Sequence, residues 1–171
     1  MHRARDPGAG YGRLGLSAAT GATRMAHISS TQFMAALPER VRGHIAPSWR
    51  DFRSQHRSWL CQLYFGDPAI HYEIWNMGER RGKLELGVPF ESRDHARNQH
   101  WLQIVSAAMV GVKATLGEAW ECEPWDRGWT KVYTTVPYEP FTTDYLDRNA
   151  RDLARAIETL QPIIAAGSPR S

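Results

Sequence analysis

The stretch HYEIWNMGERRGKLELGVPFE, residues 71–91, decides the fold that this sequence predicts. On both sides of a charged turn at residues 78–82, apolar side chains alternate with polar ones. The apolar members of the alternation are Ile70, Tyr72, Ile74, Leu84, Leu86, Val88 and Phe90. A period of two residues is what a sheet with one buried face requires. We therefore predict a β-hairpin, which needs further strands or a helix against its apolar side because an isolated hairpin is only marginally stable.

Three other segments have the composition of strands. Residues 58–65 precede the hairpin, and a Gly-Asp-Pro turn at 66–68 separates them from it. Residues 119–125 and 129–138 come later and are joined by Asp-Arg-Gly at 126–128, which is typical of a short hairpin turn. Strands joined by such short turns run antiparallel, so we expect one antiparallel sheet.

Helical patterns separate and flank these strands. Residues 29–47, 94–116 and 142–167 carry apolar side chains every three or four positions, as amphipathic helices do. Pro38 predicts a break in the first of them. A further short helix is expected from Ser48. Its outward face would carry Arg50, Arg53 and Arg57.

The predicted fold is α+β in two layers. An antiparallel sheet of about five strands is expected in the order helix-βββ-helix-ββ-helix, with the helices covering one face. The 94–116 helix is expected to be the most buried one and to pack on Leu84, Leu86 and Val88 of the hairpin.

The chain divides into three parts by composition. Residues 1–28 are rich in Gly, Ala, Ser and Arg without apolar periodicity, which predicts a flexible leader, and Met25 is an alternative start. Residues 29–167 are expected to form a single domain, and residues 168–171 a disordered tail. The sequence holds no secretory signal and no run of 18 apolar residues, so we expect a cytoplasmic protein that does not span a membrane.

Charge is distributed unevenly along the chain. Residues 1–58 carry nine Arg against three acidic residues, whereas residues 59–171 carry twelve basic and fifteen acidic residues. The Arg-rich part could reach nucleic acid or an acidic partner, and the other interpretation is a solvated leader.

The polar side of the hairpin holds the candidates for chemistry. His71 and Glu73 point to the same side of a strand, and Glu85 could face Glu73 from the neighbouring strand. These residue types can perform acid–base chemistry, so a hydrolase using these three side chains is a minor hypothesis. The favoured interpretation is a solvated polar face. No metal site and no cofactor is predicted, since no third ligand lies nearby in sequence.

Aromatic and basic side chains are the candidates for binding. Trp120 and Trp129 flank the second hairpin, where exposed indoles could stack on bases. The favoured alternative is a stabilising cross-strand pair of these two residues. The full set of candidate binding residues is Trp75, Arg80, Arg81, Trp120 and Trp129.

Residues 84–136 carry a partial resemblance to a known family. The motifs are LELGVPFES before the 94–116 helix and LGEAWECEPWDRGWTKVY after it. This run resembles an uncharacterised bacterial and archaeal domain family found C-terminal to nuclease-like or restriction-related modules. The resemblance implies a strand, a helix, a Leu-Gly turn and a Trp-containing strand, and it carries no assigned catalytic residues. The order of elements also resembles secretion-chaperone-like folds, which bind protein partners.

These observations lead to three functional hypotheses. The leading one is a small non-enzymatic module that binds a protein partner or forms a homodimer. It rests on the seven Trp residues and on the lack of a reactive constellation. The alternative is a nucleic-acid-associated accessory module of a DNA-processing or defence system. The hydrolase is the third.

Overall fold

The predicted hairpin lies in the middle of the sheet. In a computed structural model that describes residues 26–168, β3 (Tyr72–Asn76) pairs antiparallel with β4 (Lys83–Phe90), with Trp75 opposite Glu85. A 3-10 turn, η2 (Glu79–Arg81), joins the two strands. Gly78 and Gly82 bracket the turn with φ of 89° and 64°, which glycine adopts at little cost because it has no Cβ.

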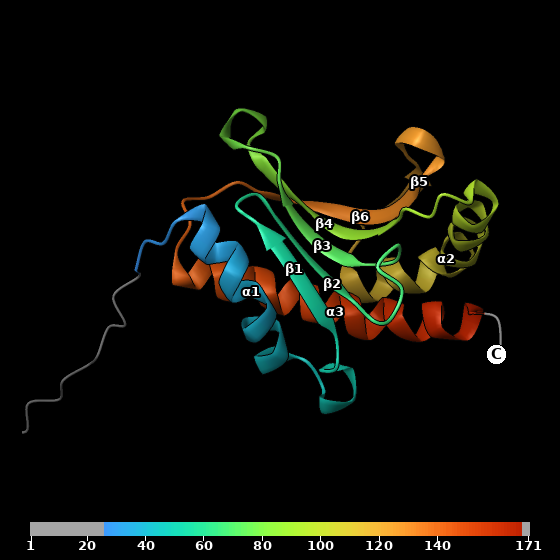
Figure 1. The fold of residues 1–171 in the computed structure, drawn as a ribbon, viewed down its shortest axis with the longest axis horizontal. Helices are drawn as coiled ribbons and strands as arrows, with labels where there is room; N and C mark the ends of the chain where they lie inside the picture. The colour runs from blue at the N-terminus through green and yellow to red at the C-terminus, as the bar shows by residue number, and fades with distance from the viewer. Residues whose placement is uncertain (1–25, 169–171) are drawn as a thin grey trace, which may run out of the picture.

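Four more strands complete one antiparallel sheet in the order β1-β2-β3-β4-β6-β5 (Figure 1). Their bounds are β1 Arg53–Arg57, β2 Leu60–Tyr64, β5 Glu121–Pro124 and β6 Thr130–Pro137. Three helices lie against one face of this sheet: α1 (Ser30–His44), α2 (His95–Leu116) and α3 (Thr143–Gly167). The prediction of an α+β fold with an antiparallel sheet is confirmed.

The strand β1 corrects the prediction around residue 48. A 3-10 turn, η1 (Pro47–Trp49), replaces the expected short helix, and Arg53 and Arg57 belong to an edge strand. The sheet therefore has six strands, with four of them before α2. All five residues of β1 are exposed, so the strand has no apolar alternation from which sequence could identify it. Its pairing with β2 is what makes it a strand.

The helix α1 runs through the predicted break. Ser29 caps it in a capping box with Gln32, and Pro38 lies inside it. Pro38 removes one backbone hydrogen bond, and packing compensates for that loss because Leu37, Pro38 and Val41 are all buried.

The core helix is α3, not α2, so the prediction about the 94–116 helix was wrong. The helix α3 packs across β3 and β4, while α2 lies over β5 and β6. The buried residues of α2 are Asn98, Trp101, Val105 and Val112, and Val110 is almost fully exposed. Apolar residues are spread around α2, whereas those of α3 form one stripe. The arrangement of apolar residues around the helix axis therefore indicates burial better than the number of apolar residues in the helix does.

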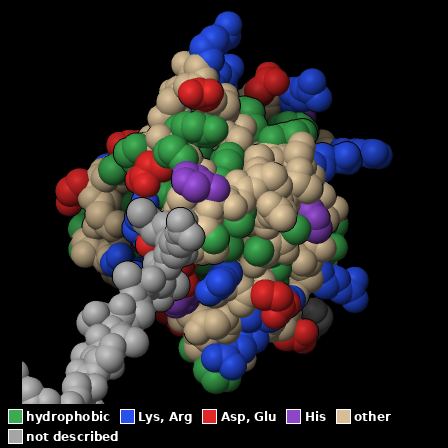
Figure 2. All heavy atoms as spheres, turned by 90° about the vertical axis from the view of Figure 1, so that its left-hand side faces the viewer, with side chains coloured by type: hydrophobic (Ala, Val, Ile, Leu, Met, Phe, Trp, Pro, Cys, Tyr) green, Lys and Arg blue, Asp and Glu red, His purple; other side chains and the backbone are tan. Residues whose placement is uncertain are grey.

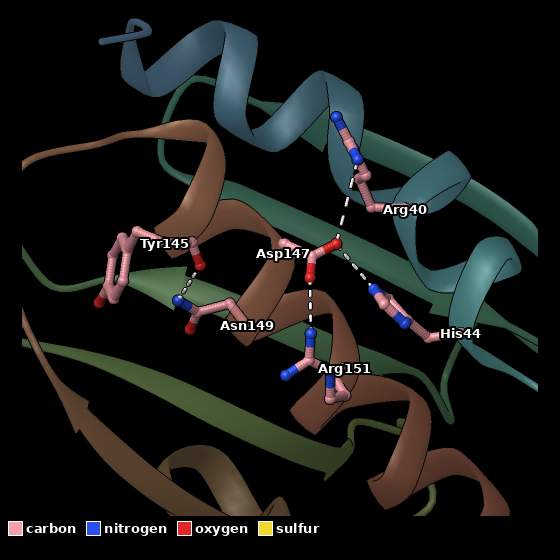
Figure 3. Close-up of polar contacts among 6 residues, drawn as sticks. All are labelled: Arg40, His44, Tyr145, Asp147, Asn149 and Arg151. Carbon is pink, nitrogen blue, oxygen red and sulfur yellow. Dashed lines mark hydrogen bonds and ion pairs between the residues drawn. The ribbon is translucent and has the colours of Figure 1, made fainter. Parts of the chain in front are cut away.

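An ion cluster joins α1 to α3 at the surface (Figure 3). The carboxylate of Asp147 lies 2.8 Å from His44 Nε2 and 2.7 Å from Arg151 Nη2, with Arg40 Nη1 at 4.0 Å. The hydrogen bond from His44, more than the nearby Arg charges, lowers the pKa of Asp147. Each of these side chains is at least a quarter exposed, so the cluster is a helix–helix contact at the edge of the core.

The expected leader and tail lie largely outside the described residues, and so does Met25. Backbone contacts join residues 27 and 28 to the residues just before α3. His27 bridges Thr142, and the Ile28 N–H donates to the Phe141 carbonyl at 3.0 Å. Between residues 26 and 168, no helix combines the length and apolarity needed to cross a bilayer.

Candidate binding site on the open face of the sheet

One face of the sheet packs on the helices, and no described helix covers the other. Cys61, Ile74, Leu86 and Val132 are among the residues that point into the core. Their neighbours in the strands point to the opposite side, which we call the open face. It carries Gln62, Glu73, Trp75, Glu85, Gly87, Lys131 and Tyr133. In Figure 1 the β3–β4 and β5–β6 turns both project away from α3.

Charged residues on the open face are buried, which overturns the prediction of a solvated polar face. His71, Glu73, Glu85 and Lys131 are only 2%, 5%, 5% and 7% exposed. Aromatic rings take the place of a helix as the cover. The Lys131 ammonium lies 3.8 Å from the centre of the Tyr133 ring and 5.0 Å from that of Trp125.

Glu85 and Lys131 form an ion pair under these rings. The Nζ of Lys131 donates to Oε2 of Glu85 at 2.9 Å, between β6 and β4. Burial raises the pKa of Glu85, although the hydrogen bond and charge of Lys131 act in the opposite direction. A charge this deeply buried is tolerated only when it is paired, so each partner depends on the other.

Gly87 provides the space for this cover. A Cβ at residue 87 would lie 2.5 Å from the Val132 carbonyl oxygen and 2.6 Å from Cβ of Tyr133. Real side chains do not approach so closely. The glycine therefore lets β6 and the Tyr133 side chain pack directly on β4.

A second buried group centres on His71. One ring nitrogen, Nδ1, lies 2.8 Å from the Pro68 carbonyl oxygen, and Nε2 lies 3.3 Å from Oε2 of Glu73. The Gln62 amide nitrogen lies 2.8 Å from His71 Nε2 and donates to the same carboxylate oxygen at 3.2 Å. Burial favours the neutral ring, but the hydrogen bond and charge of Glu73 outweigh burial, and the pKa of His71 is raised. Glu91 stands nearby, and burial raises the pKa of its carboxyl group.

The three candidates for catalysis are thus only partly brought together. His71 and Glu73 are in contact, while Glu85 is held by Lys131 in a neighbouring group. Both ring nitrogens of His71 have partners, and a general base needs a free nitrogen facing its substrate. Within residues 26–168, no three His, Cys, Asp or Glu side chains are placed to hold a metal ion.

Beside these groups the open face is hollowed. A pocket of about 260 Å³, which we call the tryptophan pocket, has indole walls and carboxylates in its lining. It is lined by Trp59, Leu60, Gln62, Glu73, Trp75, Glu91 and Trp125. Trp59 is 46% exposed, and the ring centres of Trp75 and Trp125 lie 6.3 Å apart.

A second hollow of about 300 Å³ adjoins the tryptophan pocket at the β1 edge. We call it the Arg57 hollow, and it is lined by Gln55, His56, Arg57, Leu60 and Gln62. The two hollows share Leu60 and Gln62, so they lie side by side over β1, β2 and β3, and we call the pair the groove. One end of this groove is basic and the other is acidic and aromatic.

The candidate binding residues lie in different places. Trp75 lines the tryptophan pocket, and Arg80 and Arg81 are exposed at the tip of the β3–β4 hairpin. Trp129 packs on Trp125 with ring centres 5.8 Å apart. Trp120 is buried and precedes Glu121, which pairs with Tyr133, so the predicted pairing of Trp120 with Trp129 was wrong. The pair is Trp125 with Trp129, because the Trp125 N–H donates to the Trp129 carbonyl across the turn at 2.7 Å.

Sequence reasoning missed several residues of the site. Lys131 and Tyr133 alternate on β6 and so share one face, but their positions opposite Pro89 and Gly87 of β4, from which Lys131 reaches Glu85, come only from the fold. Trp59 could not have been found from the sequence either, since its position depends on the unrecognised strand β1. Glu91 follows β4 and is held beside the segment before β3, where its N–H donates to the Ala69 carbonyl at 2.8 Å.

Comparison of the chain with protein-family models, with curated protein sequences and with solved structures finds no match. The chemistry of the site must therefore be inferred from its own residues.

Proposed function

We propose that this protein is a non-enzymatic binding module and that a segment of a partner protein occupies the groove on its open face. The observation that carries the proposal is the tryptophan pocket, which adjoins the Arg57 hollow on the sheet face that no helix within residues 26–168 covers. Aromatic residues and Arg are enriched at the centres of protein interfaces and carry much of their binding energy.

Charge complementarity describes the partner segment. Arg57 at one end of the groove favours an acidic residue, and Glu73 and Glu91 at the other favour a basic one. The buried ion pair of Glu85 and Lys131 lies beside the groove, where the Lys131 ammonium contacts the ring of Trp125, a lining residue of the tryptophan pocket. We place this activity in the cytoplasm, where the free thiols Cys61 and Cys122 would stay reduced.

A nucleic-acid-associated role in a prokaryotic DNA-processing or defence system is the second candidate. Arg53 and Arg57 on the exposed edge strand favour it. Against it, Glu73 and Glu91 in the groove would repel phosphates. On the side of the molecule in Figure 2, Lys and Arg side chains are scattered among Asp and Glu instead of forming one basic stripe. The hydrolase hypothesis has the weakest support, because His71 and Glu85 are already engaged.

The experiment is a selection of peptides on the full-length chain. We expect enriched peptides with one basic and one acidic residue, and isothermal titration calorimetry should show that Trp59→Ala or Arg57→Ser weakens their binding about tenfold. The matched control is Arg148→Ser, on the helix side, which should leave affinity unchanged. Peptides that bind both groove variants as tightly as the native chain would refute the proposal.

Two further measurements separate the alternatives. Light scattering of the native chain and of Trp59→Ala tests for a homodimer: a dimer that the variant abolishes would make a second copy the occupant of the groove. Fluorescence anisotropy with DNA and RNA at increasing salt tests the nucleic-acid role. Affinity that falls steeply with salt and drops in an Arg53→Ser, Arg57→Ser variant would favour that role over a protein partner.

A further inference from the structure

We infer that the tryptophan pocket holds the guanidinium group of an arginine supplied by the partner protein. The inference rests on the proposed function, because it names the side chain that the acidic end of the groove receives. It draws on three properties of the pocket: its indole walls, a buried carboxylate with a free oxygen, and the network that holds this carboxylate in place.

The walls favour a cation. Trp59, Trp75 and Trp125 line one pocket from three different parts of the chain: the β1–β2 turn, strand β3 and the β5–β6 turn. The face of an indole ring is electron-rich and attracts cations more strongly than other aromatic faces do. The Lys131 ammonium already makes such a contact within the protein, 5.0 Å from the centre of the Trp125 ring. The walls of the pocket offer the same attraction to a cation from outside.

A carboxylate in the pocket supplies the counter-charge. Glu73 is only 5% exposed, and both of its hydrogen bonds, to Gln62 and His71, use Oε2. Its other oxygen, Oε1, has no hydrogen-bond partner in the described part of the chain, and the side chain lines the pocket. Glu91 adds a second carboxyl group to the lining. Oε1 is not among the buried polar atoms that lack a partner, so it stays accessible from the pocket and can accept a hydrogen bond from a ligand.

The form of the site selects guanidinium over other organic cations. A guanidinium is planar, stacks on aromatic rings and still presents several N–H donors in its plane. It can therefore contact the indole walls and donate to Glu73 Oε1 and Glu91 at the same time. A lysine ammonium cannot stack, and a fully alkylated ammonium has no N–H for the carboxylates.

The network behind Glu73 holds it in position. Gln62 donates to Glu73 Oε2 at 3.2 Å, and Gln62 is itself held by Gln55 of the edge strand, whose amide donates to Gln62 Oε1 at 2.6 Å. The chain from Gln55 through Gln62 to Glu73 crosses β1, β2 and β3. The carboxylate is thus oriented before the ligand arrives, which reduces the entropy lost on binding.

The test uses nuclear magnetic resonance on the full-length chain with three small probes: the N-acetyl, N-methylamide derivatives of arginine, lysine and citrulline. The seven Trp residues give seven indole N–H signals, which report each ring separately. We expect the arginine probe to shift the signals of Trp59, Trp75 and Trp125 and to leave those of Trp101 and Trp120 in place. The neutral citrulline probe should bind at least about tenfold more weakly, and the lysine probe should bind in between.

Single-residue variants show where on the protein the arginine probe binds. Trp59→Ala removes an exposed wall and should weaken arginine binding about tenfold without unfolding the chain. Glu91→Gln and Glu73→Gln remove a carboxylate from the lining. Glu121→Gln is the control, because Glu121 is an exposed acid on β5 outside the pocket. If Glu73→Gln does not fold, Trp59→Ala and Glu91→Gln decide the result.

Several outcomes would overturn the inference while leaving the proposed function intact. Citrulline binding as tightly as arginine would show that charge is not recognised, and lysine binding as tightly would show that guanidinium is not selected. Arginine binding that is unchanged in both Trp59→Ala and Glu91→Gln would place it elsewhere. Selected peptides that occupy the groove without an arginine would separate the two proposals, since the groove would function without this contact.

Discussion

Lys131 and Glu85 form a salt bridge of 2.9 Å on the face of the sheet that no described helix covers, and both side chains are more than nine-tenths buried. Their cover consists of the rings of Tyr133 and Trp125. The open face is therefore an ordered layer with charges inside it and aromatic rings above them. This layer supports the groove in which we place the partner.

The first prediction concerns the ion pair. Lys131→Met should lower the free energy of unfolding by about 3 kcal/mol, because it leaves the Glu85 carboxylate buried without a partner. Adding Glu85→Gln should restore much of the loss, since the second change removes the stranded charge. Urea denaturation at neutral pH measures both values.

A surface lysine provides the control for this prediction. Lys113 pairs with Glu121 at 3.5 Å, and both side chains are partly exposed to solvent. Lys113→Met should therefore change the free energy of unfolding by less than about 1 kcal/mol. A Lys131→Met variant as stable as Lys113→Met would contradict the importance of the buried pair.

The second prediction concerns pH. Because the folded-state pKa of His71 is raised above its ordinary 6.5, the imidazolium contact with Glu73 stabilises the fold fully below about pH 6.5. This contribution is lost as pH rises through the raised folded-state pKa. The advantage of the native chain over His71→Gln should therefore shrink as pH rises from about 6.5 through that raised pKa. Urea midpoints across that range measure it.

A direct titration checks the same point. The ring signals of His71 in a nuclear magnetic resonance experiment should titrate above pH 6.5 in the native chain. In Glu73→Gln they should titrate at lower pH, because the carboxylate that favours the charged ring is gone. A His71 that titrates below pH 6.5 in the native chain would show that burial outweighs Glu73.

The third prediction concerns the cluster in Figure 3. Asp147→Asn removes the carboxylate that joins His44 to Arg151 across α1 and α3. These side chains are partly exposed, so the loss should be less than about 1 kcal/mol and should vanish in concentrated salt. The lowered pKa of Asp147 means that its contribution is present at neutral pH and is lost only as pH falls through that pKa. Thermal unfolding with and without salt tests this, and a loss that persists in salt would contradict it.

The fourth prediction concerns Gly87. Gly87→Ala should destabilise the protein by about 1–3 kcal/mol, because the new Cβ would collide with backbone and side-chain atoms of β6. Gly111→Ala is the control. Residue 111 lies inside α2, and a Cβ there would have no neighbouring atom within 4 Å, so alanine should be neutral or stabilising by up to about 1 kcal/mol. Equal stabilities of the two variants would be inconsistent with the close approach of β4 and β6.

The sequence predicted those elements in which buried residues recur at the regular spacing of a strand or a helix. The hairpin at 71–91 and the stripe of α3 both appear in the structure. No regular spacing of apolar residues predicts the strand β1 or the continuation of α1 through Pro38. The helix α1 is held by packing on the distant helix α3, whereas β1 is held by pairing with the neighbouring strand β2.

The candidate site shows the same division. Alternation along residues 71–91 was sufficient to put His71, Glu73, Trp75 and Glu85 on one side of a sheet, and this was determined by the sequence alone. Only the tertiary structure decided whether that side is exposed to solvent or covered by other side chains. Lys131, Tyr133 and Trp125 come from strands and turns about forty to sixty residues further along the chain. Burial of a charge depends on the partner and the rings that surround it in space, and no spacing along one strand contains that information.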